Sequence, residues 1–141
     1  MTHENSTAAS WLKVYAATAL VMLAIDAVWL GFIARPLYVQ AIGPLMADPP
    51  RWGVAALFYL AYPAGLVWLA VRPQAGTKGL RATAVAGAAL GLFAYGTYDL
   101  TNLATLRGWP VWIAALDMAW GTAVSAVAAA AGKAVLDRMA R

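Results

Sequence analysis

The 141-residue sequence contains no cysteine and a single histidine, His3. The absence of cysteine excludes disulfides, thiolate metal sites and thiol catalysis. Because His3 lies in a polar N-terminal segment, haem or zinc held by buried imidazoles is excluded, and so is a Ser-His-Asp triad. The sequence has no glycine-rich phosphate loop or nucleotide fingerprint, and no lysine deep within an apolar run to carry a retinal Schiff base. We therefore expect no cofactor and assign no catalytic residue.

Charged residues are also scarce. They make up 11% of the chain and hydrophobic residues 63%, against about 25% and about 45–50% in soluble domains. This composition indicates a membrane protein with one domain, whose first partner is the lipid bilayer. In a soluble protein the net charge of +4 would suggest nucleic-acid binding. Here the basic residues lie between apolar runs, as membrane topology requires, so no nucleic-acid partner is expected.

Apolar runs near the length of about 20 residues that crosses a bilayer define the predicted organisation. We predict a disordered polar tail, residues 1–10, and a single all-α integral membrane domain, residues 11–141, folded as a four-transmembrane-helix bundle. The helices are expected at approximately residues 11–34, 52–71, 82–106 and 110–132. Four prolines in residues 35–51 argue against a long regular helix there.

The basic residues predict the orientation of the bundle. One side carries Lys13, Arg72, Lys78, Arg81, Lys133, Arg138 and Arg141. The other side carries Arg35, Arg51 and Arg107. Since cytoplasmic loops have the excess of Lys and Arg, both termini are expected to be cytoplasmic.

Aspartates interrupt the predicted first, third and fourth helices at Asp26, Asp99 and Asp117. Ionisable residues at membrane depth are rare and mark functional sites. With this topology they fall roughly 6–10 Å below the outer boundary, in one layer with aromatic and amide side chains. The candidate ligand-binding residues are Asp26, Trp29, Tyr59, Tyr62, Tyr95, Tyr98, Asp99, Asn102, Asp117 and Trp120. A metal here would be a hard cation on the oxygens of Asp26, Asp99, Asn102 and Asp117.

Small residues form stripes at helical spacing, Gly87 with Gly91 and Gly121 with Ser125. Such pairs let a neighbouring backbone approach closely, so they predict packing seams that could also hold a homodimer or a membrane partner. A second pattern is local: residues 24–31 resemble residues 115–121, each with an Asp and a Trp three residues apart. An inverted repeat is one interpretation of this short match.

Each candidate also has a structural interpretation. The aspartates could be protonated acids that hydrogen-bond across helices, and the aromatic residues could be packing or interface anchors. Trp52, Trp109 and Trp112 lie at helix ends and are predicted interface anchors. Arg107 is predicted to be a flanking charge, with a role as counter-ion to Asp99 as the alternative.

Four segments carry a resemblance to a known family: Asp26-Ala-Val-Trp29-Leu-Gly31, residues 57–66, Tyr95-Gly-Thr-Tyr-Asp99-Leu-Thr-Asn102 and Asp117-Met-Ala-Trp120-Gly121. The chain resembles the domain of unknown function 2177 family of bacterial predicted membrane proteins over nearly its whole length. The resemblance implies a multi-pass protein of the bacterial inner membrane. It implies no activity, and no functional residue can be carried over from it.

Three classes of function remain open. The first, which we favour, is a small transporter or binding protein for a proton, a cation or a small cationic substrate, because a layer of carboxylates would bind positive charge. The second is a membrane enzyme or accessory factor that acts on lipids, with carboxylates as acid and base. The third is a structural subunit that binds a membrane partner through its glycine seams.

Overall fold

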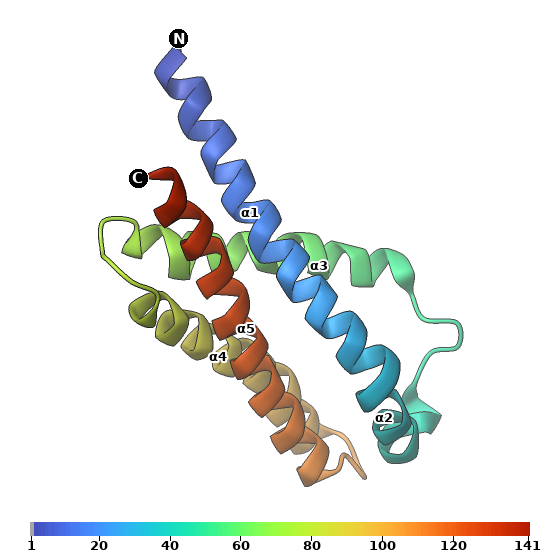
Figure 1. Ribbon diagram of the computed structural model, residues 1–141. Helices are drawn as coiled ribbons and strands as arrows, with labels where there is room; N and C mark the ends of the chain where they lie inside the picture. Colours follow the sequence, from blue (N-terminus) through green and yellow to red (C-terminus); the bar gives the residue numbers. More distant parts are fainter. Residues whose placement is uncertain (1) are drawn as a thin grey trace.

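The computed structural model describes residues Thr2 to Arg141, with side chains from Thr7 onward, and the described chain is helical (Figure 1). The elements are α1 (Thr2–Val28), the π-helical η1 (Trp29–Ala34), α2 (Arg35–Ile42), η2 (Gly43–Leu45), α3 (Trp52–Leu66), η3 (Val67–Val71), η4 (Arg72–Gln74), α4 (Arg81–Thr105) and α5 (Val111–Met139). The prediction of an all-α fold is confirmed.

The first helix is longer than predicted at both ends. It starts at Thr2, inside the segment expected to be a disordered tail, and it continues through η1 into α2. The expectation that Pro36 would stop the helix was wrong, because the π-helical η1 leads directly into α2 and Pro36 lies at the junction, in the first turn of α2. Regular helix ends at η2, which contains Pro44.

Within the described residues, three helical stretches are long and apolar enough to cross a membrane: Thr7–Leu45, Trp52–Gln74 and Val111–Met139. The fourth predicted span, α4, has a sufficient length of 25 residues. Its glycines, threonines, Asp99 and Asn102 lower its hydropathy. The count of four spans and the orientation of the termini therefore stay predictions.

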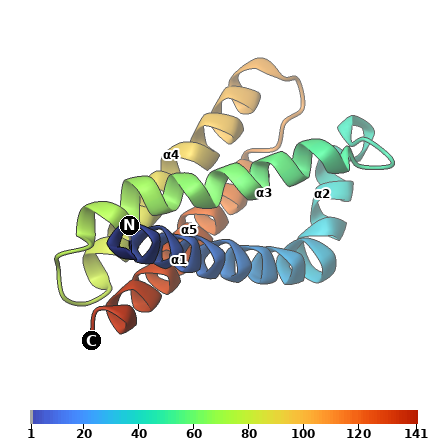
Figure 2. The same ribbon diagram turned by 90° about the horizontal axis from the view of Figure 1, so that it is seen from above.

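Helix α5 is the centre of the packing, since it makes its largest contacts with α4 and α1. Helix α3 crosses α1 at a steep angle in Figure 1, and Figure 2 shows α3 and α4 above α1 in that view. Both chain ends lie toward the top of Figure 1, whereas the turn between α4 and α5 lies at the bottom. This arrangement brings the end of α1, the start of α3, the end of α4 and the start of α5 to one half of the molecule.

Glycines allow α4 and α5 to touch in an antiparallel register. A Cβ added at Gly87 would lie 2.7 Å from both the Ala129 Cβ and the Ser125 carbonyl oxygen, and one added at Gly91 would overlap the Gly121 carbonyl. Gly87, Gly91, Gly121 and Ser125 are all buried inside the chain. The seam they were predicted to form is thus occupied within one protomer. Any homodimer or membrane partner remains a prediction.

Two apolar clusters flank the polar layer. The larger cluster joins α1, α3, η3 and α5 through Val14, Met22, Leu66, Ala70, Val71, Val124, Ala128 and Ala129. The smaller joins α2 to α5 through Ile42, Trp109, Ile113 and Ala114. Trp109 is only 7% exposed, so its assignment as an interface anchor was wrong. It is buried because α2, expected to be loop, packs in this region.

Lys133 also differs from its prediction as a flanking charge. Helix α5 continues past Gly132 to Met139, and Lys133 is fully buried. Its Nζ donates to the Thr77 carbonyl oxygen at 2.8 Å and to the Asp137 carboxylate. The sequence therefore does contain a lysine inside a helix. Its ammonium is paired, as buried charges must be.

Candidate functional site

A cavity of about 470 Å³ lies among η1 and the ends of α1, α3, α4 and α5 that share one half of the molecule. Its lining residues are Asp26, Trp29, Leu30, Phe58, Tyr59, Ala94, Tyr95, Tyr98, Asp117 and Trp120. Most of this wall is aromatic, with carboxyl groups contributed by α1 and α5. The volume falls in the range of small-molecule sites, and the cavity is partly open rather than sealed.

Asp26, on α1, is 3% exposed and has hydrogen-bond donors on both carboxyl oxygens. The Trp120 indole Nε1 donates to Oδ1 at 2.7 Å, and the Tyr59 hydroxyl donates to Oδ2 at 2.9 Å. A buried carboxyl group is costly unless it is hydrogen-bonded, and here both of its oxygens have a donor. Helices α1, α3 and α5 thus meet at this side chain.

Trp29 and Trp120 stack against each other, with ring centroids 4.2 Å apart and planes inclined by 8°. These are the tryptophans of the short Asp–Trp match, so the matching segments meet face to face. The match is not symmetric in its bonding. Trp120 donates to Asp26, whereas the buried Trp29 Nε1 has no hydrogen-bond partner among the described residues.

Asp117, on α5, also lines the cavity and accepts a hydrogen bond from the Tyr38 hydroxyl of α2. Its carboxyl group neighbours the carboxyl group of Asp99 on α4. Asp99 is 1% exposed, and its Oδ2 makes no hydrogen bond to any residue that the structure describes. This pair is therefore less completely satisfied than Asp26.

Behind the wall, tyrosines connect the cavity to the glycine seam. The Tyr62 hydroxyl shares a hydrogen bond of 2.7 Å with the buried Ser125 Oγ. The Tyr62 ring stacks on Phe58 and meets Tyr95 edge-on. Tyr95 in turn fills the space that the missing side chain of Gly121 leaves. Tyr62 and Ser125 thus support the site from outside the cavity.

The structure brings most of the predicted residues to one place, but not all. Asp26, Trp29, Tyr59, Tyr95, Tyr98, Asp117 and Trp120 line the cavity. Asp99 reaches it only through Asp117, and Tyr62 lies behind it. Asn102 is half-buried on α4 and is not part of the wall.

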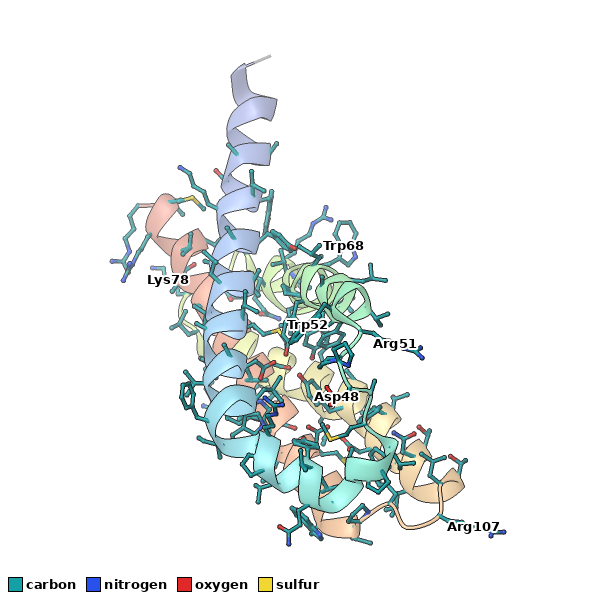
Figure 3. All side chains as sticks on the ribbon, turned by 90° about the vertical axis from the view of Figure 1, so that its right-hand side faces the viewer. Asp48, Arg51, Trp52, Trp68, Lys78 and Arg107 are labelled. Atoms are coloured by element: carbon teal, nitrogen blue, oxygen red, sulfur yellow. The ribbon has the colours of Figure 1, made fainter. Side chains whose placement is uncertain are left out.

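No side-chain cation balances these carboxyls in the part of the chain whose side chains are described. Arg35, Arg51 and Arg107 are exposed, and Figure 3 shows Arg51 and Arg107 extending away from the helices. The alternative of Arg107 as a counter-ion to Asp99 was therefore wrong. Among the same residues, no three acidic, histidine or cysteine side chains converge as a metal site would need. The predicted oxygen ligands are not gathered into one set.

Sequence reasoning missed Tyr38, which holds Asp117, and the wall residues Leu30, Phe58 and Ala94. Tyr38 was missed because residues 35–51 were taken as a loop outside the membrane. A signal existed: Pro36 suits the first turn of a helix. Leu30, Phe58 and Ala94 carry no polar group, and only the three-dimensional arrangement distinguishes them from lipid-facing residues.

A second, more open groove of about 570 Å³ adjoins the cavity and shares Phe58 and Tyr59 with it. It is formed by the α2–α3 loop and the start of α3 through Met46, Ala47, Pro50, Arg51, Val54 and Ala55. Phe58 is 41% exposed and lines both spaces. The groove therefore adjoins the cavity on the side of the α2–α3 loop.

Residues 11–134 match the family model described as Predicted membrane protein (DUF2177). No curated protein matches the chain. No solved structure matches it either.

Proposed function

Since the chain belongs to this family of predicted membrane proteins, we propose that it binds a small organic cation in the aromatic cavity and carries it across the membrane. The single observation behind the proposal is a cavity of about 470 Å³ with carboxyl groups and aromatic rings on its wall and no side-chain cation in contact. Negative charge and ring faces in a site of low dielectric attract cations.

The shape of the site favours an organic cation over a bare ion. A small metal ion would need several oxygen ligands to replace its water, and the described residues offer no converging group of that kind. The rings of Trp29, Tyr95 and Trp120 suit an alkylated ammonium group, which keeps its charge while losing little hydration. Asp26 then supplies a carboxylate held in place by Trp120 and Tyr59.

The proposal includes a bacterial inner membrane, four spans with α4 as the third, and cytoplasmic termini. Two observations support it: both termini lie toward the same end of the molecule in Figure 1, and basic residues flank the spans. Because the chain has no cysteine, single cysteines can report topology. In intact cells, a membrane-impermeant maleimide should label a cysteine at Asp48 and leave one at Lys78 unlabelled until the cells are opened.

Binding can be tested on the purified protein in detergent with choline and benzyltrimethylammonium. A ligand at 100 times its dissociation constant adds about 2.7 kcal/mol of stability, which a melting curve detects. We expect the cations to raise the melting temperature and to change the fluorescence of the stacked tryptophans. The neutral isostere of choline, 3,3-dimethyl-1-butanol, should do neither.

The matched variants are Asp26→Asn in the cavity and Asp48→Asn in the exposed loop. Asp26→Asn should weaken cation binding at least tenfold, and Asp48→Asn should leave it unchanged. Equal binding by both variants would contradict the proposal. The same probes, applied outside sealed vesicles that contain the protein, then measure whether binding leads to transport.

A further inference from the structure

The carboxyls of Asp99 and Asp117 form a pair that differs from Asp26. The α4–α5 register sets it up: Gly91 faces Gly121, so Asp99, two turns further along α4, comes beside the first turns of α5. There its carboxyl meets that of Asp117. Asp99 is 1% exposed and has a carboxyl oxygen without a partner, while Asp117 reaches the cavity.

From this geometry, and on the premise of the proposed function, we propose that Asp99 and Asp117 share one proton, which leaves when an organic cation occupies the cavity beside Asp117. The protein would then exchange a proton for its substrate at one site. Nothing in the cation-binding proposal alone requires this exchange, because Asp26 could serve as the only counter-ion.

The surroundings of the pair leave its negative charge uncompensated. The Tyr38 hydroxyl from α2 donates to Asp117, and Tyr98 from α4 lies near both carboxyls. Asp26 from α1 and Tyr59 from α3 line the same cavity as Asp117. None of these groups is cationic, and Arg51 and Arg107 extend away from the helices in Figure 3. The mutual repulsion of two neighbouring carboxylates in such a place favours one proton shared between them.

Asp26 is unsuited to this role. Both of its oxygens already accept hydrogen bonds, one from Trp120 and one from Tyr59. The buried Oδ2 of Asp99 has no such donor among the described residues. We therefore assign different tasks to the two places, with Asp26 as the hydrogen-bonded counter-ion and the exchangeable proton at the pair.

The exchange is balanced in charge and atoms. The O–H bond of the protonated carboxyl breaks, its electron pair stays on the carboxylate, and the proton passes to water. The incoming cation then supplies the positive charge that the proton supplied before. Proton and cation compete, so the bound states alternate, as coupled exchange across a membrane requires.

The test is calorimetric titration of the detergent-solubilised full chain with benzyltrimethylammonium, near pH 7, in buffers of different ionisation enthalpy. This probe has no acidic proton, so every proton released comes from the protein. We expect about one proton released per cation bound. The apparent Kd should fall by up to about tenfold for each unit of rising pH while the pair is protonated.

The variants separate this inference from the proposed function. Asp99→Asn should bind the probe, release no proton and lose the pH dependence, because no second carboxyl is left to share a proton with Asp117. Asp26→Asn should bind the probe more weakly but still release the proton of the Asp99–Asp117 pair.

If the parent binds with no proton release, or if Asp99→Asn still releases one, the shared proton is disproved while cation binding stands. If the parent binds no cation probe, the proposed function itself fails. Should Asp99→Asn not fold, the number of protons released per bound cation is compared between the parent and Asp117→Asn instead.

Discussion

Helices α4 and α5 build two contrasting regions from the same antiparallel pair. Around Gly87, Gly91 and Ser125 the helices touch, and no space is left between them. One to two turns further along, Tyr95 and Asp117 surround a cavity of about 470 Å³. The comparison teaches that side-chain size along one seam decides where a bundle closes and where it stays open. Glycines let the two helices close on each other, and the larger rings further along leave a cavity between them.

The largest effect should come from filling the closed region. Gly91→Leu would drive its side chain into the Gly121 carbonyl and the Ser125 side chain. We expect a loss of more than about 3 kcal/mol of stability, or no folded protein, measured by thermal melting in detergent. Gly65→Leu is the control, since a Cβ there meets nothing within 4 Å. Similar melting of the two variants would show that the seam is looser than described.

A substitution at Lys133 tests the contact between the α3–α4 loop and the C-terminal part of α5. Lys133→Met removes the donor to the Thr77 carbonyl and to Asp137. Losing a buried charged donor should lower stability by about 1–3 kcal/mol. The exposed Lys78→Met should stay within about 0.5 kcal/mol of the parent. If both variants melt alike, the buried ammonium does not tie the α3–α4 loop to α5.

Trp120→Phe tests the hydrogen bond to Asp26 at the cavity, because it keeps a ring over Trp29 but removes the donor. Stability should fall by about 1 kcal/mol, in line with interhelical hydrogen bonds in membranes. Binding of benzyltrimethylammonium should weaken as well. Trp112→Phe, at an exposed position, should change neither quantity. Unaltered binding by Trp120→Phe would mean that Asp26 needs only Tyr59.

The smallest effect is expected on the exposed face of α4. The Thr101 hydroxyl bonds carbonyls of its own helix, at Thr97 and Tyr98. Thr101→Val should therefore change the melting temperature little, by the equivalent of about 0.5 kcal/mol or less. Ser125→Ala, which loses the bond to Tyr62 across helices, should cost more. A larger loss of stability for Thr101→Val than for Ser125→Ala would indicate an unrecognised binding partner on the exposed face of α4.

The aspartates show how far sequence reasoning could reach. Hydropathy located Asp26 and Asp117 in apolar runs, and counting along the helices put them at similar depth. The structure lines one cavity with both. The tryptophan stack had only the short Asp–Trp match to suggest it, and the match could not say that the rings would touch.

Other features depended on where helices end, which periodicity determines poorly. Pro36 was taken as the end of a helix, so α2 and its Tyr38 were missed. Gly132 and Lys133 were taken as a flank, although α5 continues to Met139. In both places, the residues that packing buries lie beyond the expected boundary.

The sequence by itself determined the class of protein and its family, because composition and apolar run length follow directly from what a bilayer solvates. It also identified the polar residues that interrupt apolar runs, and it predicted their depth from the constant rise of a helix. Only the tertiary structure decided that Asp26 is fully hydrogen-bonded and that Asp99 and Asp117 form a pair. Those differences depend on how helices rotate and cross, and that is set by contacts between residues far apart in the chain.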